Sequence, residues 1–177
     1  MDIFDAIKGR RSVRAFKPDL VPDEFLNKVL EAAQWAPSAG NRQARDFIIV
    51  KDYKVKRLLC EVALGQCFIE EAPVDVVVCA NEERSASRYG DRGRNLYCLL
   101  DAAASAQNLL LAVHALGIGA CWIGAFRDEK VMEILNLPEW LRHIAIIPIG
   151  NPAEEPWPTP RMRLESLVHK DRCKNAS

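Results

Sequence analysis

The sequence predicts an α+β fold with three layers, in which helices cover both faces of a central sheet. Helix-like and strand-like segments are intermixed along the chain, but they do not alternate regularly as they would in a doubly wound parallel sheet. One long and nearly uncharged segment, residues 96–116, has the composition of a helix buried in a core or at a dimer interface. With 177 residues and no internal repeat, the chain suits a single domain, residues 1–177.

Hydrophobic periodicity places the helices. Residues 1–10 carry apolar side chains at helical spacing, and a second helix is expected to begin near Pro22 and to end before Pro37. Asp23 and Glu24 suit its first turn, because acidic groups are stabilised at the positive end of the helix dipole. Further helices are expected at residues 52–63, 96–116 and 128–135.

Short apolar and β-branched runs place four strands, at residues 47–50, 74–80, 120–123 and 144–149. The polar segment 81–95 carries four arginines and is predicted to be an exposed loop or lid that shapes the mouth of a substrate site. From residue 151 the chain becomes rich in proline. Residues 151–177 are therefore expected to form an extended arm, with a last turn or short strand at 164–168.

Charge and cysteine content exclude several classes of protein. The 24 basic and 24 acidic residues balance, so no net charge attracts nucleic acid or an anionic membrane. Polar residues interrupt the apolar segment 96–116, which disfavours a membrane span, and no signal peptide is visible. The six cysteines form no C-x-x-C pair and the three histidines lack metal-ligand spacing. We expect a cytoplasmic protein with neither a metal site nor disulfides.

A basic cluster follows the first helix, formed by Arg10, Arg11 and Arg14 together with Ser12, a neutral hydrogen-bond donor. Clustered guanidinium groups repel one another unless an anion offsets their charge, and they donate paired hydrogen bonds to phosphate oxygens. The alternative is a solvated basic corner whose arginines pair with acidic surface residues. We interpret the cluster as a phosphate-binding segment.

The turn after the second helix supplies polar groups of a different kind. Its candidate binding residues are Pro37, Ser38, Ala39, Gly40, Asn41 and Gln43. Gly40 would let the backbone approach a ligand closely, and the hydroxyl and amide side chains offer donors and acceptors. The alternative is an ordinary loop that ends a helix. Together with the basic cluster, this turn indicates a bound nucleotide-like cofactor, for which flavin mononucleotide (FMN) is the leading candidate.

Two later segments add candidates. Residues 117–124 contain glycines, but their spacing and their position between a helix and a strand exclude a dinucleotide-binding fingerprint. Gly124, at a strand end, could present backbone N–H groups to a flat ligand. Arg161 and Arg163 lie on the arm, which either folds back to the same phosphate or forms a disordered basic tail.

In their order and spacing these segments resemble the flavin-dependent nitroreductase family, specifically its short members. The resemblance covers nearly the whole chain and rests on the sequences RRSVRAF, APSAGN, DAAASAQNLLLA, HALGIG and CWIG, at residues 10–16, 36–41, 101–112, 114–119 and 121–124. It implies a homodimer whose three-layer fold has a mixed, mostly antiparallel sheet and a tail that crosses to the other subunit. Two flavins would lie at the dimer interface.

The resemblance also implies roles for individual residues. Arg10, Ser12 and Arg163 would hold the FMN phosphate, assisted by Arg11 or Arg161, and Arg14 would lie nearer the ribityl chain and the pyrimidine edge. The partner subunit would contribute its turn through the residues Pro37, Ser38, Ala39 and Asn41. The backbone near Ile123 and Gly124 would face the flavin ring. The family commonly has proline after the glutamine of this turn, whereas Ala44 follows Gln43 here.

The function implied is an FMN-dependent oxidoreductase that passes a hydride from NAD(P)H to a small organic acceptor, such as a nitroaromatic or a quinone, by a ping-pong mechanism. The protein itself would need no catalytic nucleophile. One alternative is a flavin-binding or storage protein with little turnover. A nucleic-acid binder that uses the arginines at 10–14 and 84–94 is disfavoured, because the net charge is zero and no aromatic and basic platform is present.

Overall fold

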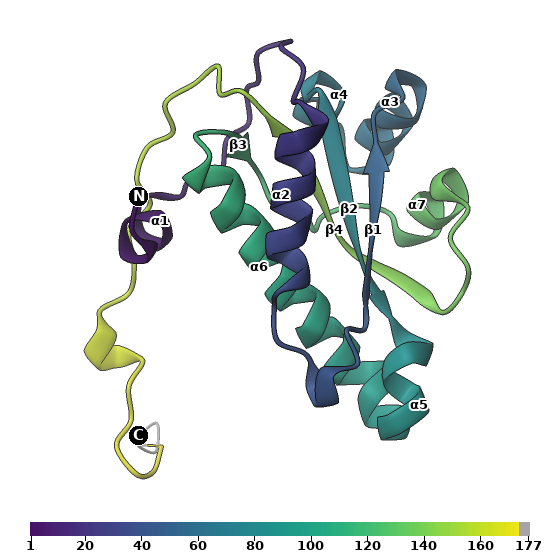
Figure 1. Cartoon of the computed structure of the whole chain (residues 1–177), viewed down its shortest axis with the longest axis vertical. Helices are drawn as coiled ribbons and strands as arrows, with labels where there is room; N and C mark the ends of the chain where they lie inside the picture. Colours follow the sequence, from purple (N-terminus) through teal and green to yellow (C-terminus); the bar gives the residue numbers. More distant parts are fainter. Residues whose placement is uncertain (174–177) are drawn as a thin grey trace.

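The computed structural model describes residues 1–173, which form one four-stranded sheet between two layers of helices (Figure 1). The predicted three-layer α+β fold is confirmed. The predicted helices and strands are also present, except that their bounds shift by a few residues and one segment changes class.

The sheet has the strand order β1-β2-β4-β3. Its strands are β1 (Arg45–Val50), β2 (Val74–Asn81), β3 (Gly119–Ala120) and β4 (Leu141–Gly150). All three pairings between these strands are antiparallel. The sheet was expected to be mixed, and in the described residues its one parallel pairing is an isolated bridge between Ser12 and Ala120. β2 is buried along its whole length, because helices cover both of its faces.

Alternate residues of β2 enter two separate cores, as the two-residue period of a strand requires. Val76 and Val78 pack with α2 (Asp23–Gln34) and α6 (Cys98–Ala115) on one face of the sheet. Val77 and Cys79 pack on the other face with residues of α3 (Tyr53–Val62), α4 (Phe68–Glu71) and α7 (Asp128–Leu135). The short helix α4 is absent from the sequence prediction.

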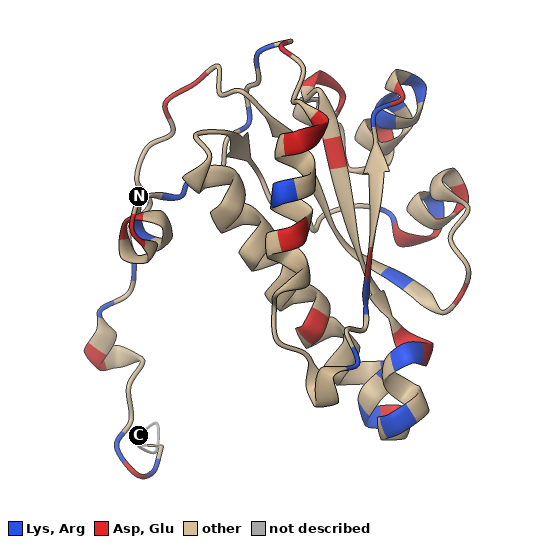
Figure 2. Cartoon of the chain, in the orientation of Figure 1, with Lys and Arg blue, Asp and Glu red and all other residues tan. Residues whose placement is uncertain are grey.

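The long helix α6 is tan over almost its whole length in Figure 2, since Asp101 is its only acidic or basic residue other than a histidine. By length and composition alone, the helical stretch 82–115 could cross a membrane. In the fold, however, Ala102, Ala106 and Leu109 of α6 are fully buried against the sheet and α2. This is the arrangement of a core helix.

The prediction of an exposed loop at residues 81–95 is wrong. The segment forms α5 (Glu82–Arg92), followed by a π-helical turn, η2 (Gly93–Tyr97), which leads directly into α6. The side chain of Asn81 accepts a hydrogen bond from the backbone N–H of Arg84, at 2.9 Å, and so caps the helix. The segment is polar because one side of a surface helix faces water, not because it lacks regular structure.

The first helix and residues 151–173 lie beside the three-layer body (Figure 1). α1 (Ile3–Gly9) begins after Asp2, whose carboxylate accepts hydrogen bonds from the backbone of Phe4 and Asp5. Residues 151–173 are extended apart from one 3₁₀ turn, η3 (Leu164–Ser166), and Figure 1 shows them leaving the sheet and running past α1. The expected extended arm is therefore found as far as residue 173, and residues 174–177 lie outside the described part.

Candidate cofactor site

The basic segment 10–14 runs along the short edge strand β3. The backbone N–H of Val13 donates to the carbonyl oxygen of Ala120 at 3.0 Å, and Ser12 pairs with the same residue. The two backbones come this close because residue 119 is glycine: a Cβ there would lie 2.9 Å from a methyl carbon of Val13. These contacts attach the predicted phosphate-binding segment to the sheet.

The cluster lines a cavity of about 490 Å³. Arg10, Arg11, Ser12 and Arg14 lie on its wall, and so does Arg161 of the arm. Arg11 already donates from Nη1 to the carbonyl oxygens of Lys8 and Arg10, at 2.6 and 2.8 Å. The guanidinium groups of Arg10 and Arg14, by contrast, have no hydrogen-bond or ion-pair partner within residues 1–173. They remain available to an anion.

Acidic residues that sequence reasoning missed face the same cavity. Glu154 and Glu155 line it, and the carboxylate of Glu154 accepts a hydrogen bond from the backbone N–H of Arg14. Their only signal in the sequence is their place at the start of the arm. Bound to backbone, the Glu154 carboxylate fixes the course of the arm and leaves the Arg14 guanidinium unpaired.

The field of the cluster reaches His114 in the last turn of α6. Its ring lines a second cavity of about 490 Å³ together with Arg10 and Arg11, and its Nε2 lies 2.9 Å from where a Cβ on Gly9 would stand. Burial, and then the charges of Arg10 and Arg11, lower the pKa of His114. The cations are therefore close enough to influence any charge placed between α1 and α6.

Of the two arginines on the arm, the structure brings Arg161 to the cluster. Its Nη1 donates to the hydroxyl of Thr159 at 2.6 Å, and its side chain lines the cavity. Arg163 is exposed, precedes η3, and does not line this cavity. Within one chain, the arm therefore contributes Arg161, and not Arg163, to the cavity of the basic cluster.

The turn at residues 37–43 is folded by its own side chains. It contains a 3₁₀ turn, η1 (Ala39–Asn41), and the backbone N–H of Gln43 donates to the Ser38 hydroxyl at 2.9 Å. Gly40 has φ +53°, and a Cβ there would stand 2.2 Å from the hydroxyl oxygen of Tyr89 on α5. The glycine is thus required by the neighbouring helix, whereas the sequence suggested a close approach to a ligand.

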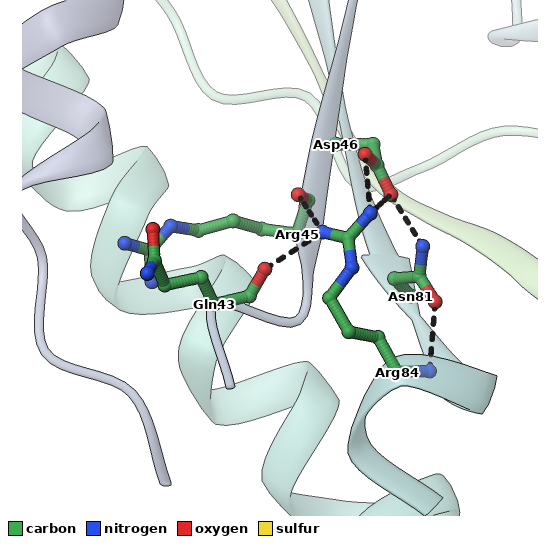
Figure 3. A network of polar contacts seen from close by, with 5 residues as sticks. All are labelled: Gln43, Arg45, Asp46, Asn81 and Arg84. Carbon is green, nitrogen blue, oxygen red and sulfur yellow. Dashed lines mark hydrogen bonds and ion pairs between the residues drawn. The ribbon is translucent and has the colours of Figure 1, made fainter. Parts of the chain in front are cut away.

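Three buried or half-buried side chains hold this turn from outside. The guanidinium of Arg45, at the start of β1, donates to the carbonyl oxygens of Gln34 and Ala36. Asp101 of α6 accepts a hydrogen bond from the backbone N–H of Ala39 at 2.9 Å. Arg84 of α5 donates to the carbonyl oxygens of Gln43 and Arg45 and pairs with Asp46, as Figure 3 shows.

The turn and the basic cluster lie at opposite ends of α6. Ala39 binds to Asp101 near the first turn of that helix, whereas Gly9 and Arg10 lie beside His114 near its last. At 1.5 Å per residue the two helix positions are about 20 Å apart. One chain therefore does not bring the two predicted halves of the site together.

The segment after β3 begins at Cys121, whose thiol lies within reach of the charges of Arg14 and Arg10. The backbone of Ile123 both donates to and accepts from the backbone of Ile146, at 3.0 Å each way, and its side chain is buried. Gly124 is exposed. Of the two residues predicted to face a flavin ring, Gly124 is thus the one whose surface is accessible.

The residues that line the cavity of the basic cluster are suited to binding an anion. The cavity is lined by the guanidinium-bearing Arg10, Arg11, Arg14 and Arg161, by the hydroxyl-bearing Ser12 and by Glu154 and Glu155, and no group of three metal-ligating side chains occurs in residues 1–173. Such a donor set suits a phosphate-bearing ligand, because arginine donates two parallel hydrogen bonds to phosphate oxygens.

Comparison with known proteins shows what the chain is similar to. The model of the nitroreductase family matches residues 7–66 and 56–151. An NADH dehydrogenase of Thermus thermophilus is 33% identical over 195 residues, which cover 95% of each chain. An FMN reductase [NAD(P)H] of Bacillus subtilis is 29% identical, over 98% of this chain and 75% of that protein.

The fold comparison agrees. The solved structure of the NADPH:FMN oxidoreductase of Vibrio harveyi, complexed with NAD⁺, superimposes with a TM-score of 0.90 at 26% identity. The match covers 98% of this chain and 79% of that one. The family model spans most of the chain, including the basic cluster, the turn and Gly124. The chain therefore belongs to the nitroreductase family of enzymes.

Proposed function

We propose that this protein is an NAD(P)H-linked flavin oxidoreductase that binds FMN and passes a hydride to a small organic acceptor by a ping-pong mechanism. The observation that carries the proposal is the pair of unpartnered guanidinium groups, Arg10 and Arg14, at a cavity shared with Ser12 and Arg161. The printed names of the relatives, FMN reductase and NADPH-flavin oxidoreductase among them, support the same class of reaction.

The residues present fit FMN. The flavin supplies hydride acceptance and donation at N5, so no side chain of the protein needs to act as a nucleophile. Arg10 and Ser12 would hold the phosphate, with Arg11, Arg161 or Arg163 assisting, and Arg14 would place a positive charge nearer the ring. The exposed backbone at Gly124 would face the flavin and orient it.

We further propose that the working form is a homodimer. The halves of the site, about 20 Å apart on one chain, meet if the turn at residues 37–43 of a second chain joins the basic cluster of the first. Large apolar side chains are also exposed to solvent on the single chain. Phe4 on α1 is 67% exposed, and Trp157 on the arm is 88% exposed. A second copy would bury both, with the arms exchanged between subunits.

Four measurements on the purified protein test these proposals. An absorption spectrum, taken after incubation with FMN and gel filtration, should show bound flavin, and light scattering should give the mass of a dimer. Anaerobic addition of NADH or NADPH should then bleach the flavin band, and a nitroaromatic or a quinone should restore it. Initial rates at several fixed acceptor concentrations should give parallel double-reciprocal lines.

The failures are distinguishable. A monomer that takes up no flavin in excess FMN would refute both proposals. A yellow dimer that NADH and NADPH leave oxidised would instead favour the alternative, a flavin-binding or storage protein with little turnover.

A further inference from the structure

A pair of cysteines lies outside the cofactor site, in the turn between α3 and α4. Cys60 is in the last turn of α3, and Cys67 immediately precedes α4. The chain reverses between them through Leu64 and Gly65, which both have positive φ, and the N–H of Gly65 donates to the carbonyl oxygen of Cys60 at 3.0 Å. The sulfur of Cys67 lies 3.3 Å from the carbonyl oxygen of Gly65. Gly65 therefore contacts both cysteines, through its N–H to Cys60 and its carbonyl oxygen to Cys67.

The two thiols are neighbours with different access to solvent. Cys60 is 5% exposed, whereas Cys67 is exposed. Burial raises the pKa of the Cys60 thiol to about 11, and the adjacent Cys67 thiol is the next cause of the rise. At neutral pH Cys60 is therefore a protonated inner thiol, and Cys67 is the outer thiol that a reagent meets first.

We propose that Cys60 and Cys67 form a redox-sensitive pair, which closes to an intramolecular disulfide when hydrogen peroxide oxidises the outer thiol. The sulfur of Cys67 attacks one peroxide oxygen, the O–O bond breaks, and a sulfenic acid and one water form. The sulfur of Cys60 then attacks the sulfur of Cys67, so that the S–S bond forms, the S–O bond breaks and a second water leaves. Two thiols lose two electrons and two protons, and one peroxide is reduced to two waters.

The turn also touches the segment that follows β3. The side-chain amide of Gln66 donates to the carbonyl oxygen of Ala125 at 3.1 Å, and the N–H of Arg127 donates to the carbonyl oxygen of Val62 at 3.0 Å. A disulfide would therefore tie together the turn that supports the residues next to Gly124. The proposal does not depend on flavin binding, since neither cysteine lines the cavity of the basic cluster.

The test maps the disulfide on the full-length protein. Reduced protein is treated with hydrogen peroxide and then unfolded in urea, where the remaining thiols are alkylated, and the chain is digested with a glutamate-specific protease. Cleavage after Glu61, Glu70 and Glu71 places Cys60, Cys67 and Cys79 in three different peptides. We expect the Cys60 and Cys67 peptides to be joined, with a mass about 2 Da below their sum, until dithiothreitol separates them. Cys79 should be alkylated.

Matched variants make the outcome decisive. Cys67→Ser should abolish the joined peptide. Cys60→Ser should leave Cys67 as a sulfenic acid that dimedone captures, and Cys173→Ser should change nothing. The proposal is overturned if Cys67 ends as a sulfinic acid or joins two chains while Cys60 remains alkylatable. It is equally overturned if the joined peptide forms as fast in urea as in the native protein, because the fold would then contribute nothing.

Discussion

The arginines of residues 10–14 differ in what surrounds their charged groups, although they are alike in sequence. The guanidinium of Arg11 donates hydrogen bonds to two backbone carbonyl oxygens. The guanidinium groups of Arg10 and Arg14 line the cavity and have no protein partner in residues 1–173. A backbone-bound arginine stabilises the end of α1, while an unpaired one keeps its hydrogen-bonding capacity for a ligand. Arg10 and Arg14 are therefore the residues whose replacement should change binding more than folding.

Arg10→Ala should weaken FMN binding about 10- to 100-fold, because a hydrogen bond to a charged group contributes roughly 1.5–3 kcal/mol. Binding of riboflavin, which lacks the phosphate, should change little. Quenching of flavin fluorescence gives both dissociation constants. Arg57→Ala is the matched control, since Arg57 is an exposed arginine of α3 that pairs with Glu61 outside the cavity. Equal losses for FMN and riboflavin would show that Arg10 does not contact the phosphate.

At the scale of elements, the turn at residues 37–43 is held by groups from three different parts of the chain. Arg45 comes from β1, Asp101 from α6 and Arg84 from α5. The buried charge of Arg45 is offset by Asp101, and burial is nevertheless the main cause that lowers the pKa of Arg45. A loop held this way keeps one shape in the free protein, so that less ordering is needed when a ligand binds.

Arg45→Met should lower the free energy of unfolding by about 2–3 kcal/mol, because the buried carbonyls of Gln34 and Ala36 lose their donor. Urea unfolding followed by circular dichroism measures the change. Lys28→Met on the exposed side of α2 is the control, since its ion pair with Glu24 is at the surface and contributes at most about 1 kcal/mol. If the free energy of unfolding falls by as little as in the control, the hydrogen bonds of Arg45 do not stabilise the turn at residues 37–43.

At the scale of the whole molecule, a buried histidine couples stability to pH. His143 of β4 is 3% exposed, its Nε2 lies 3.2 Å from a carboxylate oxygen of Asp128, and its ring packs against Phe126. Burial lowers the pKa of His143, helped by Arg142 and opposed by Asp128. Because the folded pKa lies below the unfolded value, the unfolded chain binds the proton more readily, and protonation favours unfolding.

The contribution of His143 to stability should therefore be complete above pH of about 6.5 and should fall as the pH drops below that value, by an amount of order 1 kcal/mol per unit of pKa shift. Urea midpoints between pH 8 and pH 5 measure the slope. His143→Gln should flatten part of it. His114→Gln should flatten another part, since the pKa of His114 is also lowered. If the His143→Gln slope equals that of the wild type, His143 is not the group responsible.

Local pattern was enough to predict most of the elements. The α7 helix has the predicted bounds, because its apolar spacing and the residues around it leave few alternatives. Residues 81–95 show where this reasoning fails. Their high polarity favoured a loop, but a cap by Asn81 and the ion pair between Arg84 and Asp46 stabilise a helix there. The partner of that ion pair lies 38 residues earlier in the chain, where no local pattern reveals it.

Sequence by itself determined the order of most helices and strands, the basic cluster, the polar turn and the extended arm, because these follow from residue type and short-range spacing. Only the tertiary structure decided which groups meet. It placed Arg161 and Glu154 at the cluster, gave Gly40 a neighbour in Tyr89, and put the turn at the far end of α6 from Arg10. Those contacts join residues far apart along the chain, and they arise from how the layers pack rather than from any local preference.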